Sequence, residues 1–305
     1  MVNTQRIATF ADLFCGIGGF HYAASSLGLA CVFACDIDKH AARQYEHNFG
    51  VKPAGDITEL EVSQIPDHDL LFAGFPCQPF SIIGSRAGMS DSRGTLIYEV
   101  IRILHAKQPS AFVLENVRQL VTIEQGATLN KVILELEHAG YVCDWRVLNA
   151  LDFGLPQRRE RVIIVGFKDT LYQDFMWPTG TAAMKSLSEI LEADPHPKYF
   201  ASKRIRDSRH RKHTAEFYPS IWHENKSGNI SSHPYSCALR AGASYNYLLV
   251  NGERRLTPRE QLRLQGFPDS FEIICNDSQV RKQAGNAVPI PMVQAVIRAV
   301  KEALN

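Results

Sequence analysis

The chain has 305 residues, long enough for a large core built as one big domain or as a large domain carrying a smaller one. Its 33 basic and 32 acidic residues nearly cancel, so any charged binding surface must be local. The seven cysteines are an odd number and the N-terminus has no signal pattern, so we expect a reducing compartment and no disulfides. No apolar run approaches the ~18 residues of a membrane span, so we expect a cytoplasmic protein without membrane contact.

Short apolar runs alternate with helical patterns from the start to about residue 167. The predicted strands are 7–14, 30–35, 69–74, 111–116 and 161–167, and the predicted helices are 19–27, 39–49, 95–107 and 128–139. Strands this apolar are buried on both faces, and their alternation with helices implies a parallel sheet covered on both sides. The predicted fold class is therefore α/β, with a doubly wound, mostly parallel sheet.

The regular alternation stops after Phe167, where prolines punctuate a long stretch without periodicity. This predicts a second, smaller domain at 176–279. The segment 289–304, PIPMVQAVIRAVKEAL, has a helical pattern whose apolar face needs a partner such as the sheet. We therefore expect a first domain at 1–175 that is completed by residues 280–305.

Three acidic or glycine-rich stretches are expected beyond the carboxyl ends of the predicted strands, where doubly wound sheets bind ligands. DLFCGIGGF, residues 12–20, lets the backbone approach a ligand closely, although it also suits a plain strand–helix corner. Asp36, twenty positions after Gly16, can accept hydrogen bonds from ribose hydroxyls. Asp56 is either an acceptor for an adenine amino group or a helix cap. Together they indicate an adenosine-containing cofactor, and a nicotinamide dinucleotide is disfavoured because His21 stands where its third glycine would fall.

The nearest approach to a metal pattern is Cys31 and Cys35 with His40. Their spacing differs from that of paired zinc ligands, and both cysteines lie in the apolar segment ACVFAC. Core packing is the better interpretation, and we expect no metal site.

GFPCQPFS, residues 74–81, places Cys77 directly after Pro76 and two residues before Pro79. A thiol is the best nucleophile among uncharged side chains because a few per cent of it is thiolate at neutral pH. Prolines on both sides restrict the backbone and would hold the sulfur in one attack geometry. The alternative is a packed thiol in a rigid turn.

VLENV, residues 113–117, ends an apolar strand with Glu115 and Asn116. A carboxylate at such a position is costly to bury unless it is protonated, paired or used. A structural ion pair with Arg159 or Arg161 of QRRERV is an alternative to a catalytic role, and both roles can hold at once. The thiol, the acid and the cofactor stretches are then expected on one rim of the sheet.

Eight strings follow one another along the chain: DLFCGIGGF, DITEL, GFPCQPFS, DSRGTL, VLENV, LNALDFGLPQRRERV, RRLTPRE with RLQGFPD, and QAGNAVPIPM. In this order they resemble the cytosine-C5 DNA methyltransferases, and among them the small bacterial restriction-modification type. The resemblance covers nearly the whole chain except about 176–252, the expected variable target-recognition part. It implies a Rossmann-like methyltransferase fold, DNA methylation, and a possible functional pairing with a restriction endonuclease.

The chemistry implied by the resemblance assigns a role to each polar residue of the rim. Cys77 adds as thiolate to carbon 6 of cytosine, which makes carbon 5 nucleophilic, and leaves after methylation when the carbon 5 proton is lost. Glu115 binds or protonates N3, and Arg161 holds the Glu115 carboxylate and the base carbonyl oxygen. Arg159 is the second arginine expected in this catalytic group.

The resemblance also implies S-adenosylmethionine as the methyl donor, with S-adenosylhomocysteine as product. Asp36 takes the ribose hydroxyls, Ile37 packs on adenine, and Asp56 and Ile57 contact the adenine edge. The remaining expected cofactor contacts are Phe14, Gly16, Ile17, Gly18, Gly19, Pro76, Leu96, Asn286 and Val288.

Duplex DNA is the implied partner, and the target nucleotide must rotate out of the stack at a cost of a few kcal/mol. KYFASKRIRDSRHRKH, residues 198–213, concentrates basic side chains against the single acid Asp207, and phosphate contact is favoured over a merely solvated face. YSCALRAGAS, residues 235–244, lies where the family places a recognition loop. The expected DNA contacts are Gln78, Ser81, Arg204, Arg206, Arg209, Arg211 and Arg240.

Two departures from the family pattern bear on base extrusion and target choice. Ala238 precedes Leu239 where many relatives have Thr-Leu, and Ile83 stands where some have a serine.

The alternative functions are those of a tRNA cytosine methyltransferase with nearly the same motifs, a non-catalytic DNA-binding regulator and a Rossmann oxidoreductase. A methylase of this size can act as a monomer.

Overall fold

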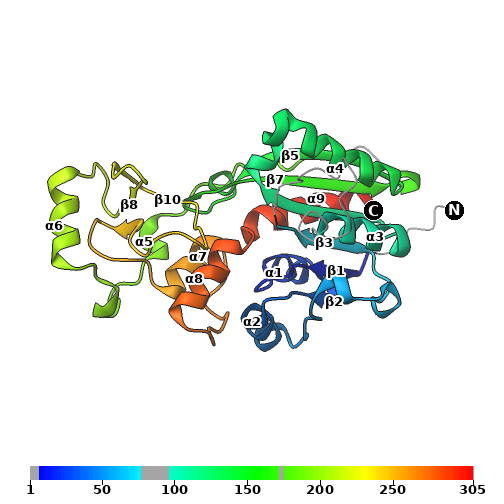
Figure 1. Ribbon diagram of the computed structural model, residues 1–305, viewed down its shortest axis with the longest axis horizontal. Helices are drawn as coiled ribbons and strands as arrows, with labels where there is room; N and C mark the ends of the chain where they lie inside the picture. Colours follow the sequence, from blue (N-terminus) through cyan, green and yellow to red (C-terminus); the bar gives the residue numbers. More distant parts are fainter. Residues whose placement is uncertain (1–6, 77–95, 172–174, 305) are drawn as a thin grey trace, which may run out of the picture. The chain divides into compact units, whose positions relative to one another are not determined.

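The computed structural model describes residues 7–76, 96–171 and 175–304, and Figure 1 labels their helices and strands. The chain folds into two compact units. The first consists of Met1–Leu148, Glu160–Thr179 and Val293–Asn305, and the second of Asn149–Arg159 and Gly180–Met292. The chain thus passes from one unit to the other four times.

A six-stranded sheet with the order β2-β1-β3-β4-β7-β5 forms the centre of the first unit. Its strands are β1 (Thr9–Leu13), β2 (Ala30–Cys35), β3 (Leu70–Gly74), β4 (Ala111–Val117), β5 (Tyr141–Asn149) and β7 (Glu160–Lys168). Strands β1, β2, β3 and β4 pair in parallel, which confirms the expected α/β class with a mainly parallel sheet. The order reverses between β1 and β3, the kind of point at which such sheets bind ligands.

Strand β7 departs from the predicted parallel arrangement because it runs antiparallel to β4, with Glu115 opposite Ile163 and Val117 opposite Arg161. Parallel neighbours need a long crossover, usually through a helix. No α-helix separates β5 from β7 in the described chain. The reversal brings Arg161, at the start of β7, to the end of β4.

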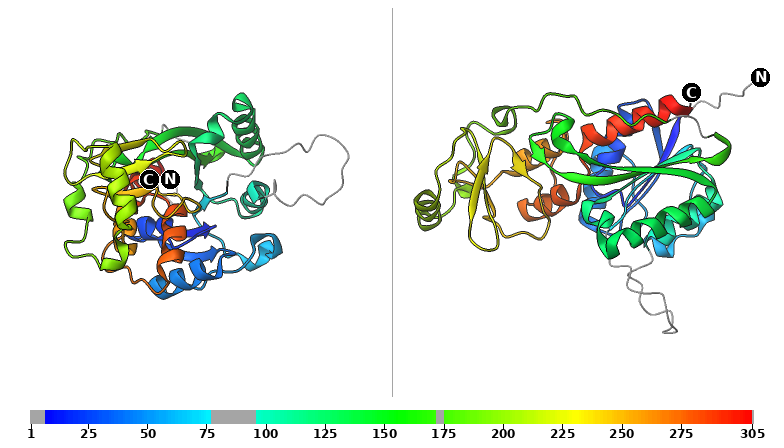
Figure 2. Two further views of the ribbon diagram at one scale, coloured as in Figure 1. Left: turned by 60° about the vertical axis from the view of Figure 1, so that its left-hand side comes forward. Right: turned by 90° about the horizontal axis from the view of Figure 1, so that it is seen from above.

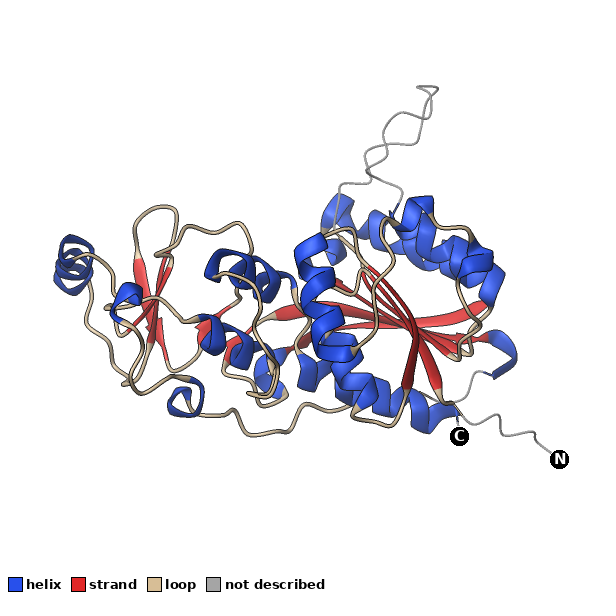
Figure 3. Ribbon diagram, turned by 90° about the horizontal axis from the view of Figure 1, so that it is seen from below, coloured by secondary structure: helices blue, strands red, loops and turns tan. Residues whose placement is uncertain are grey.

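Helices cover both faces of this sheet (Figure 3). The helices of the unit are α1 (Gly19–Ser25), α2 (Lys39–Phe49), α3 (Leu96–Lys107), α4 (Ala127–His138) and the greater part of α9 (Ile290–Leu304). On one face, buried residues of α3 and α4 share a core cluster with Leu71, Phe112 and Ile164 of the strands. On the other face, Phe20 of α1 stacks on Phe72 with ring centroids 5.4 Å apart.

Helix α9 lies beside α1, as the red and dark blue helices of Figure 2 show. Gln294 donates to Ser26 Oγ at 2.7 Å, and Lys301 Nζ donates to Leu27 O at 2.7 Å. The buried face of α9 includes Val296 and Ile297, whose side chains each stabilise the fold by about 1.5–3 kcal/mol when removed from water. The chain end thus packs within the first unit, beside the end of α1.

The second unit combines short helices with a three-stranded sheet. Its elements are α5 (Leu187–Ile190), α6 (Lys203–Lys212), α7 (Pro258–Gln265), α8 (Asp277–Asn286), the sheet β11 (Leu248–Val250), β8 (Ile221–Glu224) and β9 (Ile230–His233), and the pair β6 (Gln157–Arg158) and β10 (Ser236–Cys237). No regular periodicity in the sequence marks these elements. Within the described ranges, no helix is both long and apolar enough to cross a membrane.

Candidate active site at the carboxyl edge of the sheet

The strand register brings the predicted site stretches to one edge of the first unit. Leu13, the last residue of β1, pairs with Cys35 of β2 and with Ala73 of β3. One residue further on, Gly74 of β3 pairs with Glu115 of β4. The glycine turn, Asp36, the segment leading to Cys77 and the Glu115–Asn116 pair therefore leave neighbouring strands at the same end.

The glycine turn between β1 and α1 depends on left-handed backbone conformations. Phe14 has φ 53°, Gly16 φ 54° and Gly18 φ 87°. A Cβ on Gly18 would lie 2.2 Å from the Phe49 ring, whereas a Cβ on Gly16 would meet nothing within 4 Å. Gly18 is thus required by close packing on α2, and the backbone at Gly16 faces open space.

Asp36 ties the end of β2 to this turn. Its Oδ2 accepts from Gly16 N at 2.7 Å, and its Oδ1 accepts from Asp38 N at 2.7 Å. A carboxylate offers about four lone-pair sites in all. The neighbouring Ile37 is 71 % exposed, an unusual state for a large apolar side chain beside a core strand. An acid, an exposed apolar side chain and an open glycine turn suit the ribose and the adenine of a nucleoside.

Asp56 caps the short helix η1 (Ile57–Glu59), where its carboxylate accepts from Thr58 N at 2.9 Å and from Thr58 Oγ1 at 2.8 Å. The helix-cap interpretation therefore applies to this residue. Backbone bonds from Ala54 to Ala34 O and from Asp36 to Ala54 O hold the segment beside β2. Ile57 is buried in the core below.

Glu115 and Arg161 form a buried ion pair at the junction of β4 and β7. Arg161 Nε lies 2.6 Å from Glu115 Oε1, and the two side chains are only 12 % and 9 % exposed. Arg161 Nη1 also donates to Glu160 O at 2.8 Å. Of the two arginines that the sequence leaves open as partners of Glu115, Arg161 is the one that pairs with it.

Arg159 belongs to the second unit and has a different environment. It is fully buried, and its guanidinium donates to Leu239 O at 3.0 Å, Gly285 O at 3.0 Å and Ala287 O at 2.8 Å. These contacts tie the segment before β7 to the loop after β10 and to the end of α8. Within the second unit Arg159 therefore anchors backbone, and its expected catalytic role stays a prediction.

Asn116 holds the segment that leads to Cys77, a function that the sequence does not reveal. The side chain is buried, and Nδ2 donates to Phe75 O at 3.0 Å. Its Oδ1 accepts from Val117 N at 2.8 Å. The amide thereby fixes the carbonyl two residues before Cys77, and only its position beside Glu115 at a strand end hints at this role.

Several predicted site residues lie outside the described residues or in the second unit. Cys77, Gln78 and Ser81 lie outside the described residues, as does Ile83. Pro76 is exposed and Leu96 is half-buried at the start of α3. In the second unit, Asn286 is exposed at the end of α8 and Val288 is buried two residues later.

A buried polar network lies under the glycine turn. His21 Nδ1 lies 2.6 Å from Tyr45 Oη, which lies 3.5 Å from Asp12 Oδ2. Burial and, secondarily, the charge of Asp36 raise the pKa of Asp12 well above its usual value. Burial also raises the pKa of Cys31 to about 11 and that of Cys35 to about 12, so both thiols are protonated and behave as packed core groups.

The basic segment of the second unit forms helix α6, but its arginines are not equivalent. Arg204 and Arg211 are exposed. Arg206 pairs with Glu253 at 2.8 Å. Arg209 is buried, pairs with Glu224 at 2.9 Å and donates to Asn246 O, so it stabilises the unit from inside instead of lying on the exposed face. Arg240 is exposed, with Cζ 4.8 Å from the Tyr247 ring centre.

The fold is that of known methyltransferases. The crystal structure of a DNMT2 mutant from Spodoptera frugiperda matches with a TM-score of 0.77 at 20 % identity, covering 96 % of this chain and 99 % of that one. The methyltransferase EhMeth of Entamoeba histolytica matches with a TM-score of 0.75 at 17 % identity, covering 99 % of this chain and all of that one.

The family model of C-5 cytosine-specific DNA methylases matches residues 8–302, so the chain belongs to this family. It is 52 % identical over 298 residues to the type II methyltransferase M.HaeII of Haemophilus aegyptius, covering 96 % of this chain and 93 % of the relative. It is 53 % identical over 287 residues to M.NgoBI of Neisseria gonorrhoeae, covering 93 % and 90 %. M.HhaI of Haemophilus parahaemolyticus is 37 % identical over 310 residues, covering 97 % and 95 %. The predicted DNA cytosine-5 methyltransferase is thereby confirmed and favoured over the tRNA-directed alternative.

Proposed function

We propose that the enzyme methylates carbon 5 of a cytosine turned out of duplex DNA, with Cys77 bonded transiently to carbon 6. The observation that carries this proposal is the buried Glu115–Arg161 pair on the same sheet edge as the segment that leads to Cys77. In this proposal the first unit is a doubly wound, Rossmann-like catalytic domain. The second unit reads the target site.

Glu115 and Arg161 activate the base in this scheme. Arg161 Nε pairs with Glu115 Oε1, so we propose that the second oxygen of Glu115 contacts N3 of the cytosine. As the Cys77 thiolate bonds to carbon 6, the electron pair of the C5–C6 bond moves through the ring to N3. N3 takes a proton that the second oxygen of Glu115 carries into this step, which leaves Glu115 as the carboxylate held by Arg161, and the resulting enamine makes carbon 5 nucleophilic.

Asn116 and Pro76 would keep the thiolate in place for this addition. Asn116 fixes Phe75 O at 3.0 Å, and the ring of Pro76 fixes its own φ angle. A nucleophile held at one distance and angle gains from avoided entropy loss at the reacting step.

S-adenosylmethionine, when bound, supplies a methyl group on a sulfonium sulfur. The residues proposed to hold it are Asp36 for the ribose, Ile37 for the adenine face, and the turn from Phe14 to Gly19 for the methionine end. The exposed Ile37 and the open backbone at Gly16 support this assignment. Asp56, Ile57, Pro76, Leu96, Asn286 and Val288 remain predicted contacts.

The second unit supplies the proposed DNA surface. Arg204 and Arg211 of α6 and the exposed Arg240 present guanidinium groups suited to phosphates and base edges. Gln78 and Ser81 stay predicted contacts, and Arg209 is left out because it is buried. A methylase of a restriction-modification system, working as a monomer, is the setting that we propose.

Trapping on 5-fluorocytosine tests the covalent step. A duplex that the protein methylates is synthesised with 5-fluorocytosine at the target, and the wild type with S-adenosylmethionine should form a stable crosslink at residue 77. Cys77→Ser should neither crosslink nor methylate, whereas Cys275→Ser, a control in the second unit, should do both. Turnover by Cys77→Ser close to that of wild type would refute the adduct, and transfer of label to tRNA in place of DNA would refute the substrate.

A further inference from the structure

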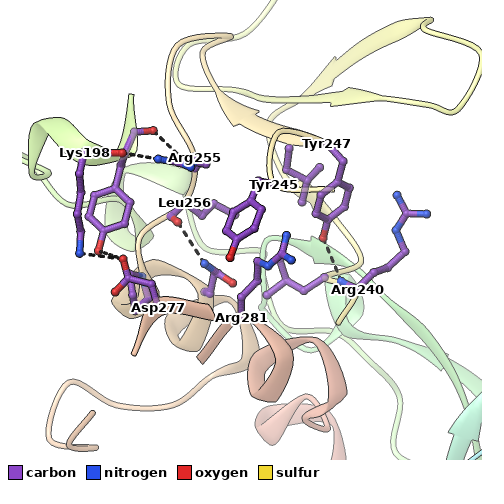
Figure 4. A pocket seen from close by; sticks show the side chains of 13 residues that line it. Lys198, Arg240, Tyr245, Tyr247, Arg255, Leu256, Asp277 and Arg281 are labelled. Atoms are coloured by element: carbon purple, nitrogen blue, oxygen red, sulfur yellow. Dashed lines mark hydrogen bonds and ion pairs between the residues drawn. The ribbon is translucent and has the colours of Figure 1, made fainter. Parts of the chain in front are cut away.

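A separate cavity of about 190 Å³ lies within the second unit (Figure 4). Its lining comes from the segment before α6, the loop after β10, the segment from β11 to α7, and helix α8. None of the residues assigned above to the chemistry or to S-adenosylmethionine lines it.

Aromatic rings and guanidinium groups form the walls of this cavity. Arg281 Cζ lies 4.0 Å from the centre of the Tyr245 ring, and Arg255 Cζ lies 5.9 Å from it. Tyr245 is nevertheless 53 % exposed, whereas Tyr247, over which Arg240 lies, is buried. An exposed ring among arginines is a stacking platform of the kind that single nucleotides use.

The charge of the lining is positive. Lys198 pairs with Asp277, the one carboxylate among the lining residues, at 2.8 Å. Arg255 donates to Tyr199 O, and Arg281 donates to Ala243 O at 2.9 Å, so carbonyls and not carboxylates receive these guanidiniums. Arg281 Nε is buried and has no hydrogen-bond partner among the described residues. The cavity therefore favours a ligand that carries an anion.

The size of the cavity limits that ligand to one ring system. A cavity of about 150 Å³ is enough to hold a benzene molecule, whereas drug-sized ligands occupy about 300 Å³ or more. One nucleobase fits 190 Å³, and S-adenosylmethionine as a whole does not. Gln261 donates through Nε2 to Leu256 O at 3.1 Å, which leaves its Oε1 as the end of the amide that can accept from a base amine.

The loop that carries Arg240 is firmly held, so this side of the cavity is preorganised. Leu239 N donates to Gln157 Oε1 at 2.9 Å, and Leu239 O accepts from Arg159 at 3.0 Å. A Cβ on Gly285 would lie 2.4 Å from Ala241 N, so α8 packs directly on this loop. A site fixed before binding loses less entropy when its ligand arrives.

We propose that this cavity is a nucleotide subsite for one base of the bound DNA other than the target cytosine. The base lies against Tyr245 with an exocyclic amine toward Gln261, and its phosphate is held by Arg240 and Arg281. This inference rests on the proposed DNA substrate. A free nucleotide has the same chemistry, and the experiment separates the two sources.

Abasic scanning of an unmethylated duplex that the protein binds tests the subsite. Each base of the site is removed in turn, and Kd is measured by fluorescence anisotropy for the wild type and for Tyr245→Leu. At one position other than the target, loss of the base should weaken wild-type binding by about 5- to 150-fold, the range of a single base–aromatic stack. Tyr245→Leu should weaken the intact duplex by a similar factor and should no longer respond to loss of that base.

Two further variants exclude a loss of structure. Tyr245→Phe keeps the ring and should behave as wild type, and Tyr218→Leu removes a ring that is 87 % exposed in the same unit and should leave Kd unchanged. A scan with no position that depends on Tyr245 would overturn the proposal. Binding of deoxynucleoside monophosphates that depends on Tyr245, together with a flat scan, would overturn the assignment to DNA.

Methyl transfer to the same duplex is measured in parallel. Transfer with a flat scan leaves the proposed function standing without the subsite. A scan that depends on Tyr245 without any transfer supports the subsite while the proposed function fails.

Discussion

Breaking the ion pair between Glu115 and Arg161 should disable catalysis far more than breaking an exposed pair of the same length. Arg118 Nη1 lies 2.6 Å from Glu160 Oε2, the same separation as in the buried pair, but its side chains are 59 % and 31 % exposed. At 2.6 Å two unit charges attract by about 6 kcal/mol at an effective dielectric constant of about 20 and by about 1.6 kcal/mol in water. Side-chain entropy and salt reduce the exposed pair further, to about 0.2–1 kcal/mol.

Arg161→Ala leaves a buried carboxylate without its partner, which costs about 3–5 kcal/mol at comparable sites. Because that carboxylate also serves N3 in the proposed mechanism, kcat should fall about 10²- to 10⁴-fold, the range for loss of a positioned proton donor. The kcat of Glu115→Gln should fall by a similar factor. The double variant should be little worse than either single variant, because the two side chains act as one unit.

The assay is single-turnover transfer of labelled methyl to a saturating duplex, with urea unfolding recorded for each variant. Arg118→Ala serves as the control and should change kcat by less than about threefold. Additive losses in the double variant would refute the coupling. So would an Arg118→Ala variant that is as slow as Arg161→Ala.

Two further predictions concern the glycine turn and its buried support. Gly18→Ala should reduce S-adenosylmethionine affinity, measured by equilibrium dialysis, and stability in urea by more than Gly28→Ala does. The added Cβ at Gly18 would lie 2.2 Å from Phe49, whereas Gly28 has open space at a similar positive φ. Equal losses would show that only the cost of the positive φ, about 1–2 kcal/mol, matters. Burial lowers the pKa of His21 to about 4, so the unfolded chain takes up a proton at this ring before the folded chain does as pH falls. The stability that the neutral ring contributes is therefore complete above pH 6.5 and is lost toward pH 4, by up to about 3 kcal/mol. Urea unfolding at pH 7.5 and 4.5 should show a smaller difference for His21→Phe than for wild type, and an unchanged difference would contradict the assignment.

The sequence predicts the elements of the first sheet well where local signals coincide with burial. Strand Ala30–Cys35 and helix Lys39–Phe49 have the expected bounds. Asp38 caps the start of this helix, where its side chain accepts from His40 N, and Gly50 caps its end in the left-handed region. Such caps are local and therefore visible in the sequence.

Strand β5 is absent from the sequence prediction because its residues are mostly half-buried or exposed at an edge of the sheet, with Asp144 and Arg146 among them. Edge strands do not need the continuous apolar run that marks the central strands. The antiparallel direction of β7 escapes prediction for a related reason. Without β5, the alternation of strands and helices looks unbroken.

The individual roles of the arginines lie beyond local patterns. Arg159 and Arg161 stand two residues apart in one motif, yet one donates to carbonyls eighty or more positions away and the other pairs with a strand end. Arg209 belongs to a basic run that looks solvated in the sequence, but its side chain is buried and pairs with Glu224. Each outcome depends on tertiary partners that no spacing rule identifies.

The four passages of the chain between the units have a consequence for engineering. The second unit is assembled from Asn149–Arg159 and Gly180–Met292, and Arg159 joins these two stretches through Leu239 and Gly285. If the second unit reads the target site, as proposed above, a chimera designed to acquire the specificity of a related methylase must graft both stretches together. A donor segment that starts only at Gly180 would have to pack against the recipient's Arg159, which binds the Leu239 and Gly285 carbonyls of this chain and not those of the donor. The two stretches would then not match, however well the donor helices fold.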